Sequence, residues 1–527
     1  MLRQLLSYLP LFQSYIYGWI PASAGKTRLG RIPASAGKTR LGRLYMTLLL
    51  FMFVGGALHA EVRSVWVLPW DISTPKAVDE VIQTALENNQ NELLVEVRYR
   101  SDALFDTSRG AYQFPNPEPL SYVLKNYEFD PLEYVLQKAH AQGLNVQAWV
   151  IVFNATPVDK ALIQQNYIYQ NHRDWLTSDK NGTRLNGTRQ FGYFIDPGVP
   201  EAQDYLLDVI SNLAAGYPDL DGIHLDYIRY PESNLGYHPV SVARYEEYCQ
   251  NHEEINFNEW RIMQVSTFVE RMSLRIKEIN PSMMLSAAVF ADIGDANVAY
   301  AQDWPNWLKR GIIDRIYPMA YNVNFTKHKA LVEQMKLIGH DERIVMGLRA
   351  WDDKGRSLSL NGGCRYTVND IAKRITHARE LGFAGVAMFS LAGLKIGNAW
   401  LQLKRISFPD SVAYPSMVQF EDPQTHVTQS DAESEEVKVG VRITHESEEY
   451  IVNLSIPFAG DWIWELHGDK LLYQNNRRYQ KGENFDWWNG IIADEEKEIE
   501  SGNYVVHLYV EDSAFKYLIP VEVKANR

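Results

Sequence analysis

The stretch DGIHLDYIRYP, residues 221–231, places a histidine, a carboxylate, a tyrosine and an arginine at the end of an apolar run. Alternate side chains of a β-strand point to opposite faces, so His224 and Asp226 share one face while Ile223 and Leu225 take the other. The apolar face suits packing against helices. The polar face is therefore predicted to point into a site, where a carboxylate and an imidazole can bind sugar hydroxyls, move a proton or hold a metal.

An earlier run, ELLVEVRYR at residues 92–100, has the same character. Glu96 and Arg98 fall on one face of this predicted strand, and Asp102 follows at its end. We expect Arg98 to orient Asp226 or to hold a substrate hydroxyl, because a guanidinium donates two parallel hydrogen bonds. Glu96 is either a second reactive carboxylate or the ion-pair partner of Arg98.

Paired carboxylates at such a site are typical of glycoside hydrolysis, in which one protonates the leaving oxygen and the other attacks carbon or activates water. Further carboxylates follow other apolar runs: Asp71, Asp292, Asp352 and Asp353. The predicted substrate-binding side chains are His224, Arg98, Asp102, Trp149, Asn154, Tyr227, Arg229, Tyr321, Asn322 and Trp351.

Three alternatives stay open at this point. Asp226 could be the buried ion-pair partner of Arg229 or Arg98. His224 and Asp226 could be ligands of a metal-dependent hydrolase such as a deacetylase, although such barrels usually use several histidines. We therefore predict no metal or other cofactor. A barrel that binds glycan without cleaving it is the third alternative.

The elements that must position these residues repeat along the chain. Eight short, β-rich apolar runs alternate with amphipathic helical patterns over about 350 residues, which is typical of a (β/α)₈ barrel. We predict this α/β barrel over residues 61–409. The runs are residues 62–70, 92–100, 144–153, 220–228, 283–290, 314–321, 343–351 and 383–391.

The C-terminal part of the chain follows a different pattern. Residues 410–436 are polar, acidic and proline-containing, which predicts a linker. Short alternating runs separated by turn residues over 437–527 predict a small all-β sandwich of the immunoglobulin or fibronectin type. Its tryptophans are interpreted as core packing in preference to a carbohydrate platform: Trp462, Trp464, Trp487 and Trp488.

The N-terminal 60 residues are also distinct. IPASAGKTRLGR occurs twice in tandem, and its AGKT does not form a phosphate-binding loop because its glycine spacing is wrong and no strand precedes it. We predict that residues 1–45 are an extension upstream of the true start or are disordered. The apolar run at 46–60 predicts a signal peptide, and hence a periplasmic or secreted protein.

Charge and cysteine content limit the partners. The 527 residues carry a formal charge of −13, and the first 60 contain seven basic residues and no acidic one, so the remainder carries −20. This disfavours nucleic acid and anionic membrane surfaces as partners, and no stable membrane insertion is expected after signal cleavage. Cys249 and Cys364 are equally compatible with one disulfide or with two free thiols.

Several separated motifs carry a family resemblance. FIDPGVPEAQDYLLDVISNLAAGYPDLDGIHLDYIRYP, at 194–231, resembles the signature of the bacterial glycosyl-hydrolase-like family ten, and RSVWVLPW, VEVRYRSDALFDT, AWVIVFNA and IYPMAYN match further motifs in order. The resemblance covers about residues 61–405. It implies an exported barrel enzyme acting on an oligosaccharide or polysaccharide, distantly similar to the α-amylase group, with peptidoglycan glycan strands as a candidate substrate.

The resemblance also implies roles for the site residues. Asp226 matches the family's first Asp of the fourth strand, and by similarity with amylase-type barrels it is expected to be the nucleophile or base, with His224 binding a sugar hydroxyl. The family often has Gln in place of Glu96 and a second Asp in place of Tyr227, so the partner carboxylate is not fixed. The acid is expected to be Asp292 or Glu96.

Overall fold

The computed structural model describes most of the chain from Ala60 onward. The described residues are 60–124, 129–184, 192–252, 255–351, 366–395, 399–415, 440–446, 449–456, 460–468, 470–479, 482–488, 491–492, 497–510 and 516–523. The predicted extension at 1–45, the predicted signal peptide apart from Ala60, and most of the predicted linker lie outside them. No helix among these residues combines the length and the apolar character needed to cross a bilayer.

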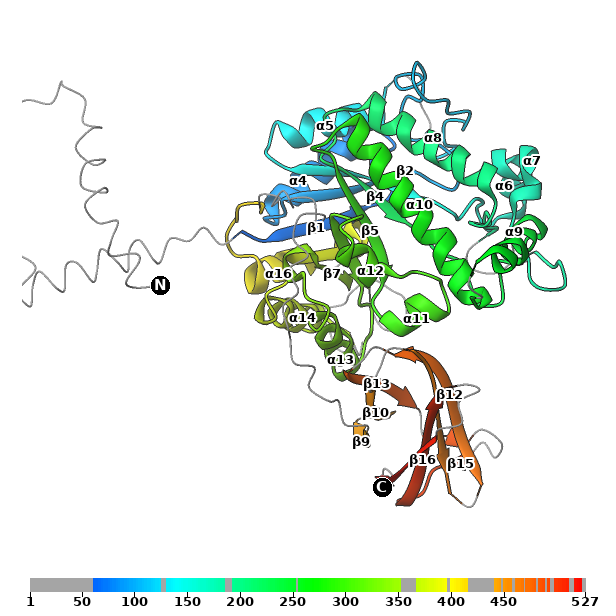
Figure 1. Cartoon of the computed structure of the whole chain (residues 1–527). Helices are drawn as coiled ribbons and strands as arrows, with labels where there is room; N and C mark the ends of the chain where they lie inside the picture. Colours follow the sequence, from blue (N-terminus) through cyan, green and yellow to red (C-terminus); the bar gives the residue numbers. More distant parts are fainter. Residues whose placement is uncertain are drawn as a thin grey trace, which may run out of the picture. The chain divides into compact units, whose positions relative to one another are not determined.

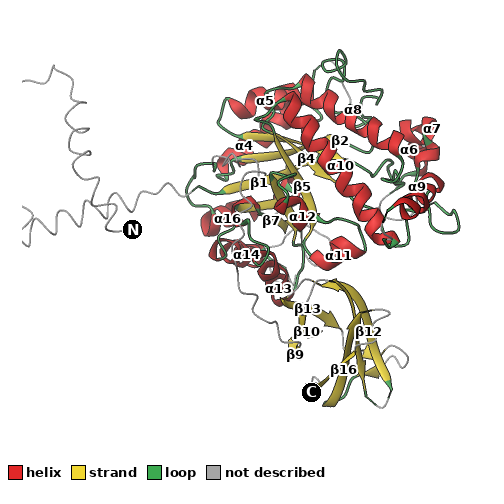
Figure 2. Cartoon of the chain, in the orientation of Figure 1, coloured by secondary structure: helices red, strands yellow, loops and turns green. Residues whose placement is uncertain are grey.

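Eight parallel strands close into a barrel in the order in which they occur along the chain (Figures 1 and 2). The predicted (β/α)₈ fold is confirmed. The strands are β1 (Val62–Val67), β2 (Glu92–Arg98), β3 (Asn145–Ile151), β4 (Gly222–Asp226), β5 (Met284–Phe290), β6 (Arg315–Met319), β7 (Val345–Arg349) and β8 (Gly385–Phe389).

Helices lie between these strands and around the outside of the barrel (Figure 2). Their N-termini carry the signals that the sequence offers: Asp130 accepts hydrogen bonds from two backbone amides of α5, and Thr367 with Asp370 forms a capping box on α14. The main helices are α4 (Pro75–Glu87), α5 (Pro131–His140), α8 (Pro200–Gly216), α9 (Pro239–Asn251), α10 (Phe257–Ile279), α13 (Phe325–Lys336), α14 (Val368–Glu380) and α16 (Ala399–Ser407). Shorter ones are η3 (Pro69–Ile72), α6 (Lys160–Gln165), α7 (Tyr167–Asn171), η4 (Arg173–Trp175), α11 (Ile293–Val298), α12 (Trp304–Lys309), η5 (Asp341–Arg343) and α15 (Leu391–Lys395).

The two faces of each strand belong to two different cores. Ile223 and Leu225 are fully buried in the large cluster that joins strands and helices. Trp66, Trp149 and Tyr317 belong to a second cluster contributed by the inward side chains of the barrel. The barrel interior is therefore a packed core, and only its upper end can hold a site.

Gly385 allows β8 to pair closely with β1. A Cβ added there would lie 1.9 Å from the carbonyl oxygen of Val62, its register partner. We expect Gly385→Ala to lower the free energy of unfolding by about 3 kcal/mol, because backbone and not a flexible side chain must move. Denaturant unfolding measures this loss. Gly468→Ala is the control, since its added Cβ meets nothing closer than 3.5 Å, and equal destabilisation by both variants would contradict the explanation.

The C-terminal strands form antiparallel sheets that share one core, as predicted. β13–β10–β9 form one sheet, β12–β11–β16–β17 a second, and β14–β15 a two-stranded ribbon. The strands are β9 (Gly440–Glu446), β10 (Glu449–Ile456), β11 (Gly460–His467), β12 (Leu471–Tyr479), β13 (Gly482–Trp488), β14 (Ile491–Ile492), β15 (Lys497–Glu498), β16 (Gly502–Val510) and β17 (Lys516–Val523). Trp462, Trp464 and Trp488 are buried in the shared core, which agrees with packing and not with a carbohydrate platform.

Candidate active site

A cavity of about 290 Å³ opens at the C-terminal ends of the barrel strands, where barrel enzymes place their reactive groups. Strands β1 to β6 and β8 all contribute to its wall. The lining residues are Trp66, Glu96, Arg100, Trp149, Ile151, Asp226, Tyr227, Arg229, Ala288, Phe290, Met319, Tyr321 and Phe389. We call this cavity the mouth cavity.

Two buried carboxylates face the mouth cavity from alternate strands. Glu96 of β2 is in register with Trp149 of β3, and Asp226 of β4 is in register with Ile151, two residues further along the same strand. Glu96 is 3% exposed and Asp226 is 7% exposed. Because the strands tilt against the barrel axis, an offset of two residues over two strands brings Glu96 and Asp226 to the same layer.

Hydrogen bonds and positive charge hold Asp226 in place. One carboxylate oxygen accepts from the Trp149 indole at 3.1 Å, and the other accepts from the Tyr227 backbone amide at 2.6 Å. Burial raises the pKa of Asp226, while these two donors and the charge of Arg229 act in the opposite direction by favouring the carboxylate form. Asp226 thus has the groups that stabilise its negative charge.

Glu96 is in the opposite situation. Its pKa is raised well above its ordinary value by complete burial and then by the negative charge of Asp226, with only the charge of Arg100 opposing them. Burial raises the pKa of both carboxyls, but the charge of the neighbouring carboxylate adds to the rise at Glu96, so the pair can supply a proton donor and an ionised partner. Glu96 is accordingly the group that keeps its proton, and Asp226 is the group that gives up its proton first.

The backbone at the mouth adopts unusual conformations. Tyr227 follows Asp226 directly and has a φ of 50°, and after β2 both Arg100 and Ser101 have positive φ values of 56° and 67°. Bulky residues rarely adopt this left-handed conformation, and such residues concentrate at functional sites where the surrounding structure imposes them. Here the conformation of Tyr227 directs its amide back to the Asp226 carboxylate.

Aromatic rings form much of the wall. Tyr321 stacks on Phe389 with ring centres 5.9 Å apart and meets Trp351 edge-on at 5.2 Å. The guanidinium of Arg229 lies over the rings of Tyr227 and Phe290, each 4.8 Å away. Flat apolar rings beside a few polar groups suit a sugar, whose C–H faces pack on aromatics while its hydroxyls accept and donate hydrogen bonds.

His224 lies below the mouth cavity, fully buried, and is not one of its lining residues. Its Nε2 accepts a hydrogen bond from the Trp66 indole at 3.2 Å, and its Nδ1 donates to the Ser286 hydroxyl at 2.7 Å, because that hydroxyl donates to Gln147. Burial lowers the pKa of His224 to about 3. The predicted contact of His224 with a sugar hydroxyl is therefore corrected: both ring nitrogens are used within the core.

Arg98 also has another role than the predicted one. Its guanidinium donates to both carboxylate oxygens of Glu118, at 2.8 and 2.5 Å, and to the carbonyl oxygens of Ile151 and Val152. Both partners of this ion pair are 1% exposed. The expectation that Arg98 orients Asp226 or pairs with Glu96 is thus corrected. The pair instead fastens the β2–α5 connection to the end of β3.

We expect Glu118→Gln to lower the free energy of unfolding by about 3 kcal/mol, because it leaves the buried charge of Arg98 without its counter-charge. Denaturant unfolding followed by circular dichroism measures the loss. Glu133→Gln is the matched control, since Glu133 pairs with Arg109 at 2.6 Å but both side chains are about one third exposed. That variant is expected to lose less than about 1 kcal/mol, and similar losses would contradict the explanation.

The remaining predicted residues fall into two groups. Trp149, Tyr227, Arg229 and Tyr321 line the mouth cavity, with Trp351 in ring contact with Tyr321. The others do not line it. Asp292 caps the N-terminus of α11, and Asn154 is buried and forms an isolated β-bridge with Phe194. The backbone carbonyl of Asn322 accepts a hydrogen bond from Arg374, and Asp102 lines a separate hollow. Burial and the charge of Glu118 raise the pKa of Asp102 to about 7. Asp352 and Asp353 lie outside the described residues.

Three aromatic members of the wall were not predicted. Trp66, Phe290 and Phe389 sit within apolar runs, where a ring facing the cavity looks the same as a ring facing the helices. The alternation of faces along a strand could have identified Trp66, because it is two residues from Ser64, whose side chain also faces the barrel interior.

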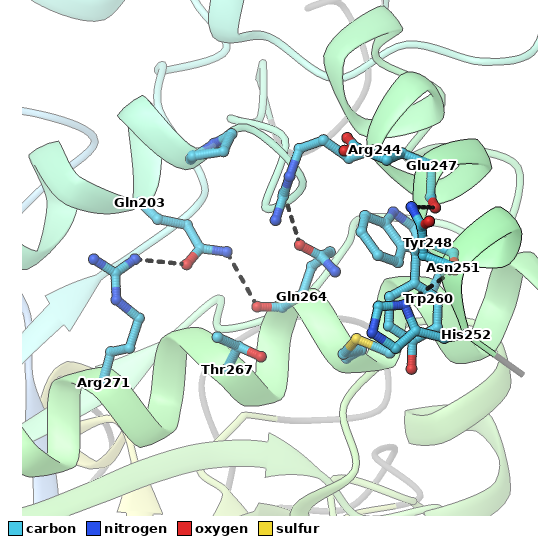
Figure 3. Close-up of a pocket in the computed structure, with 12 residues that line it drawn as sticks. Gln203, Arg244, Glu247, Tyr248, Asn251, His252, Trp260, Gln264, Thr267 and Arg271 are labelled. Atoms are coloured by element: carbon cyan, nitrogen blue, oxygen red, sulfur yellow. Dashed lines mark hydrogen bonds between the residues drawn. The ribbon is translucent and has the colours of Figure 1, made fainter. Parts of the chain in front are cut away.

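A second hollow, of about 360 Å³, lies on the outside of the barrel among α8, α9 and α10 (Figure 3). Arg271 donates to Gln203 at 3.1 Å, and Arg244 donates to Gln264 at 2.9 Å. Glu247 is the carboxylate among its lining residues. A reaction that needs two carboxylates therefore has its groups at the mouth cavity and not in this hollow.

Comparison with known proteins shows the family of the chain. The profile of the family described as glycosyl hydrolase-like 10 matches residues 61–348, which contain both Glu96 and Asp226. The chain belongs to this family. Glycosyl hydrolase YngK of Bacillus subtilis (strain 168) is 24% identical over 294 residues, covering 50% of this chain and 54% of that protein. Glycosyl hydrolase DigH of Escherichia coli (strain K12) is 27% identical over 224 residues, covering 37% and 47%.

These matches have limited extent. The chain matches about half the length of these two relatives. Among solved structures, the glycoside hydrolase domain of PgaB (BpsB) from Bordetella bronchiseptica aligns with a TM-score of 0.48 and 15% identity, covering 66% of this chain and 99% of that domain. The comparisons thus establish a glycosyl hydrolase-like barrel.

Proposed function

We propose that this protein is a glycoside hydrolase in which Glu96 is the general acid and Asp226 is the nucleophile or base. One observation carries the proposal. Both carboxylates are buried in the same aromatic-walled cavity, and the charge of Asp226 raises the pKa of Glu96. Family membership and relatives named glycosyl hydrolases support the same reaction class.

The groups would act as follows. Glu96 donates its proton to the glycosidic oxygen as the bond from that oxygen to the anomeric carbon breaks. Asp226 either attacks the anomeric carbon, forming an ester that water later hydrolyses, or removes a proton from the attacking water. Either route consumes one water per bond. The anomeric configuration of the first product, read by proton NMR, distinguishes retention from inversion.

The proposed substrate is an extracytoplasmic oligosaccharide or polysaccharide, with peptidoglycan glycan strands as the first candidate. Aromatic walls and the Arg229 guanidinium suit a sugar chain that carries hydroxyl or acidic groups. The apolar run at 46–60 supports export to the periplasm or the medium.

The test is digestion of purified peptidoglycan and a panel of common glycans, with products identified by mass spectrometry. Each cleaved glycosidic bond adds the mass of one water to the products, whereas hydrolytic deacetylation replaces an acetyl group by hydrogen and lowers the mass of the glycan. Binding of a glycan without new products supports a non-catalytic barrel. Loss of activity in chelator, under conditions in which the protein stays folded, supports the metal-dependent hydrolase. Either result would overturn the proposal.

A further inference from the structure

A compact group of metal-binding side chains lies in the C-terminal sheets. It consists of Glu465 and His467 on β11 and His507 on β16, and we call it the sheet triad. We propose that the sheet triad binds a divalent transition metal ion of the zinc class. The mouth cavity takes no part in this inference.

The pairing of the strands brings the three residues together. Glu465 is the register partner of His507, and His467 follows Glu465 by two residues, so all three project from the same face of the sheet. The intervening residues Trp464 and Leu466 point the other way, into the shared core. The sheet triad thus occupies the outer face.

The ligand atoms already have nearly the spacing of a zinc site. His467 Nε2 lies 2.9 Å from Glu465 Oε2, His507 Nδ1 lies 3.5 Å from the same oxygen, and the ligand atoms all lie within 4.8 Å of one another. Ligands about 2.0–2.1 Å from a tetrahedral zinc ion are about 3.3 Å apart. Small side-chain rotations therefore suffice to place one ion among the three.

A further feature favours a built site over a chance surface group. The imidazoles of His467 and His507 stack at 3.8 Å with an angle of 24° between their planes. His467 Nε2 is hydrogen-bonded to the Glu465 carboxylate, whose side chain is 12% exposed, and the stacked His507 ring brings its Nδ1 near the same carboxylate.

The donor set indicates the kind of ion. Two imidazoles and one carboxylate suit zinc, and also nickel, cobalt and copper ions, better than calcium or magnesium, which prefer oxygen ligands. Three protein ligands leave one tetrahedral position for water or an external group. A bound ion would join β11 to β16 and stabilise the four-stranded sheet.

The experiment is titration of the metal-free, tag-free full chain with zinc chloride at pH 7.5, followed by calorimetry and thermal unfolding. We expect one ion per chain, a micromolar or tighter Kd, and a rise in Tm. Binding should weaken as the pH falls below 6, because protons compete for the histidine nitrogens. Cobalt should give the intense visible absorption of a four-coordinate ion.

Three variants and a control connect binding to the sheet triad. His467→Gln, His507→Gln and Glu465→Gln should each weaken zinc binding at least tenfold and reduce the rise in Tm. His252→Gln, at the exposed C-cap of α9, should leave both unchanged. Circular dichroism of the metal-free variants verifies that they fold, and Glu465→Gln provides a second test if a histidine variant does not.

Two outcomes would overturn the proposal: no zinc binding at 100 µM, or wild-type affinity in all three sheet triad variants. The result also affects the chelator test of the barrel reaction, since a chelator would remove an ion from the sheet triad and lower Tm. Chelator sensitivity should therefore be compared in the Glu465→Gln variant, where loss of activity reports a metal in the barrel alone.

Discussion

Asp226→Asn is expected to lower kcat/KM on the cleaved glycan by about 10⁴-fold, a loss of roughly 5.5 kcal/mol of transition-state stabilisation. Asparagine has nearly the same shape and can still accept from Trp149 or Tyr227, so the mouth cavity should keep its structure. What disappears is the negative charge that attacks the anomeric carbon or takes the proton from water. Steady-state kinetics of the purified variant measure the loss.

Asp221→Asn is the matched control. Asp221 lies just before β4, at the opposite end of the strand, where it accepts from the Val146 amide at 2.7 Å and meets His140 at 3.0 Å. This variant should keep wild-type kcat/KM. Near-normal activity of Asp226→Asn and of Asp226→Ala would show that the assignment is wrong. The anomeric configuration of the first wild-type product separates the two roles: it is retained if Asp226 is the nucleophile and inverted if Asp226 is the base that activates water.

The barrel itself was predictable because its signal is repeated. Each apolar run contains its strand, but the runs extend past the strand ends, as 220–228 does for β4 at Gly222–Asp226. Ile228 explains the difference, since it lies beyond the strand and is nevertheless fully buried. Hydrophobicity reports burial, and at the mouth of a barrel burial continues into the loops.

The position of Arg98 was not predictable for a specific reason. Glu96 pairs with Trp149 and Arg98 pairs with Val150, so two residues of β2 advance the register by only one residue of β3. This bulge at Val97 breaks the alternation of faces and turns Arg98 away from Glu96. A parity argument assumes a regular strand, and the sequence carries no mark of the irregularity here.

Tertiary contacts also override local preference in the C-terminal sheets. β13, Gly482–Trp488, contains Gly482, Glu483, Asn484 and Asp486, residue types that disfavour strands, and lacks the alternating pattern on which the sandwich was predicted. It pairs with β10 along its length, and Asp486 accepts a hydrogen bond from the buried Trp464 indole at 3.0 Å. Pairing and a buried hydrogen bond thus determine this strand, and both depend on residues distant in the sequence.

The choice between Asp292 and Glu96 likewise needed coordinates. The positions of both residues relative to the predicted strands made them candidates for the acid. Asp292 accepts a hydrogen bond from the Asp295 amide as the cap of α11, whereas Glu96 shares the mouth cavity with Asp226. Capping residues and catalytic carboxylates can both occur directly after a strand. The selection of Glu96 leads to a second strong prediction.

Glu96→Gln is expected to lower kcat/KM about 10³-fold on a natural glycan, whose sugar leaving group must be protonated, but to change kcat/KM little with a dinitrophenyl glycoside. A dinitrophenolate leaves without a proton, so an acid contributes nothing to its departure. Parallel kinetics on the two substrates measure the difference. Glu133→Gln serves as the surface control and should match the wild type on both substrates.

The pH profile gives an independent measure of the same role. Burial and Asp226 raise the pKa of Glu96, so its proton is retained above the range of an ordinary glutamate and lost as the pH rises further. Wild-type kcat/KM should therefore fall at alkaline pH through that raised pKa, and Glu96→Gln should lack this alkaline fall. Equal losses on both substrates, with the alkaline fall intact, would instead indicate that Glu96 only positions Asp226 and that the proton comes from another group.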